Sequence, residues 1–222
     1  KAIKKGANYI VSSKKFKKNR SNIIKVNNSI KFLNNFAKLK RQNCSAKIIA
    51  ITGSAGKTSL KNMLKIILQK YGDTHSSPRS FNNHFGVPIS LSNLNQNHSY
   101  GVFEAGMSKA GEINHLTKII KPNLAVITNI AEAHIENFSN IKGIAKAKGE
   151  IIDNIIKGGT VVLNRDDKFY NYFKIKAKIK KLNVVSFGRS KKSDINLIHE
   201  SKKGNTKKLT IRIKNKKLKI KI

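Results

Sequence analysis

The sequence is poor in cysteine, apolar runs and acids, and each shortage excludes a class of protein. A single cysteine, Cys44, rules out an internal disulfide framework and fits a reducing compartment, so we expect a cytoplasmic protein. No segment approaches the roughly 18 consecutive apolar residues of a membrane-spanning helix. The first residues also lack the apolar core of a signal peptide. We therefore predict no membrane span.

Acidic residues are scarce enough to dominate the charge. The 46 Lys and Arg residues face only 11 Asp and Glu, which leaves a net charge of +35. Such a balance is typical of proteins that bind nucleic acid or anionic membranes. Here lysines are spread along the whole chain, aromatic residues make up 7%, and no aromatic-interleaved basic motif occurs. We therefore assign the charge to a lysine-rich composition and expect no specific nucleic-acid partner.

The order of apolar segments predicts an α/β fold. Between residues 47 and 187 candidate strands alternate with candidate helices, which favours a mostly parallel sheet covered on both faces. The expected strands are 47–52, 100–105, 124–130, 160–163 and 184–187; the expected helices are 58–71, 87–94, 111–120, 140–156 and 166–180. Within 58–71, apolar residues at helical spacing are expected in the core, namely Leu60, Met63, Leu64, Ile67 and Leu68. Residues 73–86 are expected to form a polar loop. The final segments alternate apolar and charged residues, so we expect an antiparallel strand extension.

The first 44 residues are expected to form part of a separate small α/β domain. They hold two short strand candidates and an amphipathic helix over 30–41, which we expect Ser29 to cap. Its expected apolar face consists of Phe32, Leu33, Phe36 and Leu39. Residues 41–46 are polar and small, as in a linker. The chain lacks an initiator Met and stops within a strand-like pattern, so we expect a piece of a longer protein.

A glycine-rich loop is the clearest functional signal. Residues 47–59, KIIAITGSAGKTS, combine an apolar strand, a loop and a helix start. The loop is shorter than the common G-x-x-x-x-G-K-[ST] pattern, but its context is that of a P-loop. Backbone N–H groups of such a loop bind phosphate, and its lysine and hydroxyl can bind phosphate and Mg²⁺. The predicted phosphate-binding residues are Gly53, Ser54, Ala55, Gly56, Lys57, Thr58 and Ser59.

Polar residues follow other predicted strands at the same sheet edge. Glu104 ends one strand and could bind Mg²⁺ directly or through water; alternatively it is an exposed acid. His134 lies beyond the next strand and is either a ligand at this site or an ordinary surface or capping residue. Lys148 lies in a helical charge run, and its spacing alone does not distinguish it from a solvated lysine. Asn129 and Asn164 also fall at strand ends.

The sequence resembles the Mur ligases, and among them the branch that adds D-alanyl-D-alanine to UDP-N-acetylmuramoyl-tripeptide. The order and spacing of the motifs match over about 120 residues. The loop motif is shared with folylpolyglutamate synthases, whereas E-x-G-M-x-x-x-G-E-I, A-H-x-E and A-K-G-E-I are more specific to this branch. The matching segments are ITGSAGKTS (51–59), FNNHFGVPISL (81–91), EAGMSKAGEI (104–113), TNIAEAHIENF (128–138), AKGEI (147–151) and LNRDD (163–167).

The resemblance implies an ATP-dependent acid–amino-acid ligase of peptidoglycan synthesis. In that family ATP phosphorylates the peptide carboxylate, and the amine of the dipeptide then attacks the acyl phosphate. Matching positions imply that Lys57 binds the β- and γ-phosphates and that Thr58 and Glu104 hold one Mg²⁺. They also imply that His134 and a carbamylated Lys148 hold a second Mg²⁺. Lys57, His134 and Lys148 are thus the expected catalytic residues.

Other positions carry weaker implications. Asn82 and Asn83 match a loop that contacts the UDP-linked peptide, while Asn164 and Asp167 match the nucleotide side without a firm role. The loop reads S-A-G where the family often has S-N-G, and EAG replaces the commoner ELG.

The resemblance also implies a domain division. Residues 1–44 resemble the later part of the family's N-terminal, UDP-binding domain, and 45–222 resemble an incomplete central ATP-binding domain. The family's C-terminal domain has no counterpart here, so we expect no ligase activity from this piece on its own. We also expect a monomer. Measured phosphate release with all substrates present would contradict this. The alternatives are another Mur or folylpolyglutamate-type ligase, and a non-catalytic basic module that binds nucleotide or nucleic acid.

Overall fold

The molecule is built on one nine-stranded sheet, as a computed structural model shows for residues 2–14, 22–132, 137–204 and 206–221. The strand order is β11-β10-β9-β8-β7-β6-β3-β5-β4, and pairing is parallel from β4 to β9 and antiparallel beyond. The prediction of a mostly parallel sheet with an antiparallel extension is confirmed. The strands are β3 (Lys47–Thr52), β4 (Thr74–Ser76), β5 (Tyr100–Glu104), β6 (Leu124–Ile127), β7 (Thr160–Asn164), β8 (Asn183–Gly188), β9 (Ile195–Lys203), β10 (Thr206–Ile213) and β11 (Lys216–Lys221).

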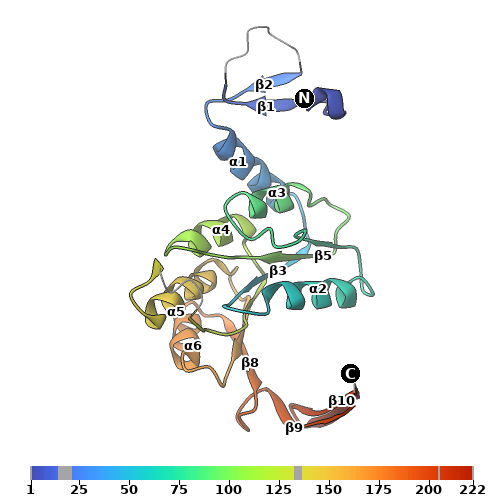
Figure 1. The fold of residues 1–222 in the computed structure, drawn as a ribbon, viewed down its shortest axis with the longest axis vertical. Coiled ribbons are helices and arrows are strands. Elements are labelled where there is room, and N and C mark those ends of the chain that lie inside the picture. Colours follow the sequence, from blue (N-terminus) through green and yellow to red (C-terminus); the bar gives the residue numbers. More distant parts are fainter. Residues whose placement is uncertain (1, 15–21, 133–136, 205, 222) are drawn as a thin grey trace.

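Helices cover the two faces of the parallel strands unequally. In Figure 1, α2 lies on one side of β3 and β5, while α3 and α4 lie on the other. The larger hydrophobic cluster lies on the side of α3 and α4 and is built on residues such as Ile48, Phe103 and Ile113. The helices are α1 (Ser29–Gln42), α2 (Lys57–Leu68), α3 (Gly86–Ser92), α4 (Glu112–Ile120), α5 (Ile141–Gly149), the 3₁₀ helix η3 (Glu150–Asn154) and α6 (Tyr170–Ile179).

The α2 side of the sheet holds a smaller cluster. Ile51, Val102 and Val126 are buried there against Leu60, Leu64 and Leu68 of α2. The prediction that Met63 and Ile67 are also core residues is wrong, because they are 60% and 52% exposed. Leucines four residues apart face the sheet, whereas Met63 and Ile67 lie one row to the side and point away from it.

The N-terminal residues form a separate lobe at one end of the long axis (Figure 1). Here β1 (Ile10–Ser12) pairs in parallel with β2 (Ile23–Lys25), after the short 3₁₀ helix η1 (Ile3–Lys5). The predicted cap Ser29 is wrong: Asn28 precedes α1 with extended backbone and accepts a hydrogen bond from the Lys31 N–H. The expected division at residue 44 stays a prediction.

Helix α1 packs on α3 and α4 rather than standing free. Ala37 is its buried residue, whereas Phe36 and Leu39 of the predicted apolar face are exposed. The Arg41 guanidinium donates to the carbonyls of Ile120, Lys121 and Cys44, which ties the end of α1 to the end of α4. Cys44 itself is buried and is a free thiol. Residues 41–46 are therefore packed against the body.

Two further predictions need correction. The segment 73–86 is not wholly a loop, because β4 pairs with β5 at the edge of the sheet. Its three residues are too few for a periodic pattern to show in the sequence. The predicted helix over 140–156 is also divided, since it tightens into η3 after Gly149. No helix of the described residues is long and apolar enough to cross a bilayer.

Candidate functional site

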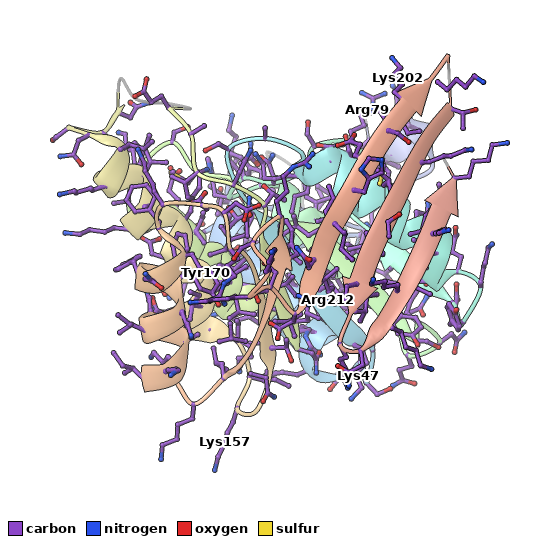
Figure 2. The ribbon with its side chains drawn as sticks, turned by 90° about the horizontal axis from the view of Figure 1, so that it is seen from below. Lys47, Arg79, Lys157, Tyr170, Lys202 and Arg212 are labelled. Carbon is purple, nitrogen blue, oxygen red and sulfur yellow. The ribbon has the colours of Figure 1, made fainter. Side chains whose placement is uncertain are left out.

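The carboxyl ends of the parallel strands bring the predicted residues to one edge of the sheet. Figure 2 shows Arg79, which follows β4, near this edge, while Lys47 and Lys157 lie toward the opposite edge, where β3 and β7 begin. In open α/β sheets this is the edge at which ligands bind. The site described below lies between the loop after β3 and the loops after β5 and β6.

The glycine loop after β3 makes a sharp turn into α2. Gly53 and Gly56 have φ values of +144° and +80°, which residues other than glycine rarely adopt. A Cβ on Gly53 would lie 1.8 Å from the Thr128 hydroxyl oxygen. The close approach of the two loops therefore requires glycine at this position.

The loop after β6 holds the glycine loop in place. The Asn129 carbonyl accepts from the Ser54 N–H at 3.0 Å, and its side-chain oxygen accepts from the Ala55 N–H at 2.9 Å. The Thr128 hydroxyl donates to the Ala55 carbonyl at 2.7 Å. The Ser54 hydroxyl exchanges hydrogen bonds with the backbone of Ala131. These contacts hold the loop in its conformation before a ligand binds. The first N–H groups of α2 have no capping side chain, because the residue at the N-cap is Gly56.

Two lysines from different helices converge on one carbonyl. Lys57 Nζ and Lys148 Nζ both donate to the Gly53 carbonyl oxygen, at 2.8 and 3.2 Å. Burial, and to a smaller extent the positive charge of Lys57, lower the pKa of Lys148 to about 8. Burial also lowers the pKa of Lys57, partly offset by the charge of Glu104. A neutral amine is therefore accessible at Lys148 under mildly alkaline conditions.

Glu104 is fully buried at the end of β5 and is paired on both oxygens. Its Oε2 accepts from the Thr58 hydroxyl at 3.2 Å. Its Oε1 lies 3.2 Å from Lys61 Nζ in an ion pair that lacks hydrogen-bond geometry. A carboxylate and a hydroxyl side by side at the start of α2 are the oxygen ligands that Mg²⁺ prefers.

A cavity of about 630 Å³ opens beside these groups. Asn82 lines it, and the Asn82 carbonyl accepts from the Gly106 N–H at 2.8 Å. Asn83 also borders the cavity, but its side-chain oxygen accepts from the N–H groups of Phe85 and Gly86 and so caps α3. The remaining lining includes Ser54, Lys57, Lys148, His84, Glu112 and His115.

Asn164 and Asp167 play structural parts next to the site. The Asp167 carboxylate accepts from the Ile130 N–H at 2.8 Å and from the Phe169 N–H at 2.8 Å. It thus fixes the loop after β6, which in turn holds the glycine loop. The Asn164 side chain accepts from the Asp166 N–H at 3.0 Å.

His134 lies outside the described residues, so its predicted ligand role stays a prediction. Among the residues that the structure does describe, no three His, Cys, Asp or Glu side chains gather as a metal site. Among the described residues, Thr58, Glu104 and a modified Lys148 could hold a metal at this edge.

Three features of the site were not predicted from the sequence: Lys61, Thr128 and the holding role of Asn129. Lys61 is 1% exposed although it lies in α2 among residues expected to be solvated. A signal was available: Lys61 lies three residues after Thr58, which places both side chains on the same face of the helix. Asn129 showed only its position at a strand end.

Comparison with known proteins agrees with this geometry. The model of the Mur ligase middle domain matches residues 51–222. A UDP-N-acetylmuramoyl-tripeptide–D-alanyl-D-alanine ligase from Rickettsia prowazekii is 43% identical over 219 residues, which cover 97% of this chain and 48% of that protein. The chain thus spans about half the length of this curated relative.

Solved structures show the same likeness. A crystal structure of MurF from Acinetobacter baumannii superposes with a TM-score of 0.88 at 29% identity and covers 96% of this chain and 46% of its own. The MurF ligase from Thermotoga maritima, in complex with ADP, gives a TM-score of 0.87 at 27% identity and covers 99% and 50%. The match to the middle-domain model extends over most of the chain, from the glycine loop to the antiparallel strands, and the chain therefore belongs to the Mur ligase family.

Proposed function

We propose that this chain supplies the phosphate- and metal-binding part of an ATP-dependent ligase. The reaction is the addition of D-alanyl-D-alanine to UDP-N-acetylmuramoyl-tripeptide in cytoplasmic peptidoglycan precursor synthesis. The observation that carries the proposal is the convergence of Lys57, Lys148, Thr58 and Glu104 beside one cavity. The relative from R. prowazekii, which bears the name of that ligase, supports the choice of reaction.

The glycine loop fits the phosphates of ATP. The first N–H groups of α2 have no side-chain cap, and a helix N-terminus favours an anion. Lys57 now donates to the Gly53 carbonyl, and the same ammonium can instead bind a β- or γ-phosphate oxygen. Ser54, Ala55 and Ser59 complete the loop that surrounds the phosphates. ATP supplies the phosphoryl group that activates the peptide carboxylate.

The residues beside the loop fit Mg²⁺. Glu104 directs its Oε2 toward Thr58, whose hydroxyl lies 3.2 Å away, while its Oε1 pairs with Lys61. The ion neutralises phosphate charge when bound. Thr58 and Glu104 would hold one ion, and His134 with a carbamylated Lys148 would hold a second.

Lys148 fits the carbamate role for a physical reason. Carbamylation requires a neutral amine, and burial has already lowered the pKa of this lysine to about 8. The product is an anion at a place where the Lys57 ammonium would stabilise it. Carbamylation therefore replaces repulsion between the buried Lys148 and the half-buried Lys57 with attraction.

The cavity fits the peptide end of the second substrate. Asn82 and Asn83 come from the loop between β4 and α3, and they line the cavity together with Ser54 and Lys57. A carboxylate placed between them would lie next to the phosphate-binding residues. Positioning of the two reactants is then the main contribution of the chain to catalysis.

Two measurements test the proposal. Isothermal titration with Mg²⁺-ADP should show one binding site on the 222-residue chain, lost on addition of EDTA. The full-length gene product should release phosphate only when ATP, UDP-N-acetylmuramoyl-tripeptide and D-alanyl-D-alanine are all present. Release with a UDP-linked dipeptide and a third amino acid, or with folate and glutamate, would favour the two alternative ligases. Tight DNA binding with a steep salt dependence and no Mg²⁺-ADP binding would favour the non-catalytic alternative.

A further inference from the structure

Lys61 is a buried cation without an assigned role. Its side chain comes from the second turn of α2 and is 1% exposed, although it is not among the residues that line the cavity. Burying a lysine in this way is costly unless the charge is paired and hydrogen-bonded. Here the ammonium has two partners from two different segments, and these partners indicate what the residue does.

The first partner belongs to the proposed metal site. Lys61 Nζ lies 3.2 Å from Glu104 Oε1, while Thr58 lies 3.2 Å from the other carboxylate oxygen. The lysine therefore occupies one oxygen of Glu104 and leaves the other directed toward Thr58. Without a partner, the Glu104 carboxylate could rotate between several orientations, because its side chain has several rotatable bonds. The ion pair holds it in one of them.

The second partner is the backbone of the loop that carries Asn82 and Asn83. Lys61 Nζ donates to the Arg79 carbonyl, and Arg79 is a non-glycine residue at φ +46°. Such a backbone conformation persists only where the surroundings hold it. Figure 2 shows Arg79 near the same edge of the sheet as the site.

The same loop is held at two other points. Near its start, the Ser77 hydroxyl accepts from the Glu104 N–H at 3.3 Å. Further along, the Asn82 carbonyl accepts from the Gly106 N–H at 2.8 Å. Both of these contacts attach the loop to β5 or to the residues that follow it. Lys61 supplies a contact of a different kind, because it connects the loop to the helix that begins at the phosphate-binding turn.

We propose that Lys61 is a positioning residue that links the metal-binding carboxylate Glu104 to the substrate-binding loop around Arg79. This inference rests on the proposed function, because it assigns Glu104 to Mg²⁺ and Asn82 to the UDP-linked peptide. One ammonium then aligns the two half-sites, although it reaches neither ligand itself. Lysine suits this role because it offers three donors on one flexible stem, enough for both partners.

The alternative, purely structural explanation is that Lys61 only neutralises the buried Glu104 carboxylate. In that case removal of both charges together would leave substrate affinity unchanged, because well-packed apolar replacement of a buried ion pair is often tolerated. A role in positioning predicts instead that the loop contact matters even when Glu104 carries no charge. A double-mutant cycle separates the two explanations.

The experiment uses the full-length gene product in four forms: unchanged, Lys61→Met, Glu104→Gln and the double variant. Titration gives the Mg²⁺ dependence of ADP affinity and, separately, the Kd of UDP-N-acetylmuramoyl-tripeptide. We expect Lys61→Met to weaken the Mg²⁺-dependent affinity for ADP and the affinity for the tripeptide, each by about tenfold or more. This is the size expected for loss of a hydrogen bond to a charged group. Glu104→Gln should weaken only the Mg²⁺ dependence. The double variant should bind the tripeptide as weakly as Lys61→Met does. Its Mg²⁺ dependence of ADP affinity should equal that of Glu104→Gln.

Leu94→Ala serves as a control for general destabilisation, because Leu94 is fully buried in the larger cluster. It should lower the Tm and leave both constants within twofold of the unchanged protein. The proposal is overturned if Lys61→Met leaves both constants unchanged, or if Leu94→Ala shifts them as far. It is also overturned if the double variant binds the tripeptide as well as Glu104→Gln does. That last comparison stands even where Lys61→Met alone fails to fold. Failure of the unchanged protein to bind either ligand would instead contradict the proposed function.

Discussion

Lysines at the carboxyl edge of the parallel strands and lysines in the antiparallel extension are in opposite situations. At the edge, Lys61 and Lys148 are 1% and 2% exposed, and each donates to a defined backbone carbonyl. In the extension, Lys208 lies directly opposite Lys221 and Arg212 directly opposite Lys217. Like charges placed opposite each other across strands destabilise a sheet, and they are tolerated here because water solvates them.

The difference shows that the lysines behind the net charge of +35 fall into two groups, one exposed and one buried with defined partners. In the extension a lysine costs little and could be exchanged for another polar residue. At the edge each lysine requires partners, because a buried ammonium is stable only when its charge and donors are matched. Function is therefore expected where burial makes the charge costly, and the exposed lysines reflect composition.

The sharpest test of this contrast is the removal of Lys148. In the full-length gene product, Lys148→Ala should lower activity by about 10²–10³-fold, the size typical of losing one electrostatic group from an active site. A short carboxylic acid in the buffer should restore part of it by replacing the carbamate. Lys146→Ala, an exposed neighbour on the same helix, is the matched control and should keep activity. Little loss at Lys148, or no rescue, would contradict the carbamate role.

The pH dependence of stability should also separate buried from exposed lysines. Because the folded-state pKa of Lys148 is lowered from 10.5 to about 8, the unfolded chain binds more protons between these values. Stability attributable to this residue therefore rises with pH from about 8 to 10.5 and is lowest below 8. In CO₂-free buffer at pH 7, Lys148→Met should be more stable by as much as about 3 kcal/mol.

Urea unfolding of the 222-residue chain and of its Lys148→Met variant at pH 7 and pH 10.5 measures this. The advantage of the variant should shrink at the higher pH. Subtracting the two proteins removes the titration of all other lysines. A difference that stays constant with pH would show that the ammonium carries no burial penalty.

A smaller effect is expected at the loop that holds the glycine turn. Asn129→Ala removes the acceptor that lies 2.9 Å from the Ala55 N–H. Loss of one hydrogen bond of about 1 kcal/mol should weaken Mg²⁺-ADP binding about fivefold. Asn183→Ala removes a similar bond, to the Gly158 carbonyl at 2.9 Å, at the opposite edge of the sheet. The control should lower the Tm without changing the Kd; equal effects on the Kd would mean that Asn129 does not preform the loop.

The smallest effect is expected in the antiparallel extension. Lys217→Glu places an acid opposite Arg212 and should stabilise the chain by about 0.5 kcal/mol, as for an opposite-charge cross-strand pair. Lys203→Glu changes the net charge equally but faces Thr206, so it reports the effect of charge alone. Urea unfolding at low salt compares the two. The prediction is wrong if both variants gain equally.

Sequence reasoning located the site but not its internal connections. The strand-end rule placed Gly53, Glu104 and Asn129 at one edge, since parallel strands share a direction. Lys148 came only from family resemblance, because nothing in the spacing of lysines marks which one is buried. Lys61 was missed although it lies three residues after Thr58, because that spacing shows a shared helix face without showing what covers it. The assignment of Met63 and Ile67 to the core was wrong because helical periodicity shows an apolar face without showing how wide its partner is.

The sequence by itself determined the order of the central strands and helices apart from β4, the glycine turn and the chemistry available at the strand ends. These follow from local rules, namely periodicity, capping and the conformational freedom of glycine. Only the tertiary structure decided which of many lysines are buried and what they contact. Lys61 meets Arg79 and Glu104, and Lys148 meets Gly53, across 18 to 95 residues of chain, and no local pattern encodes that proximity.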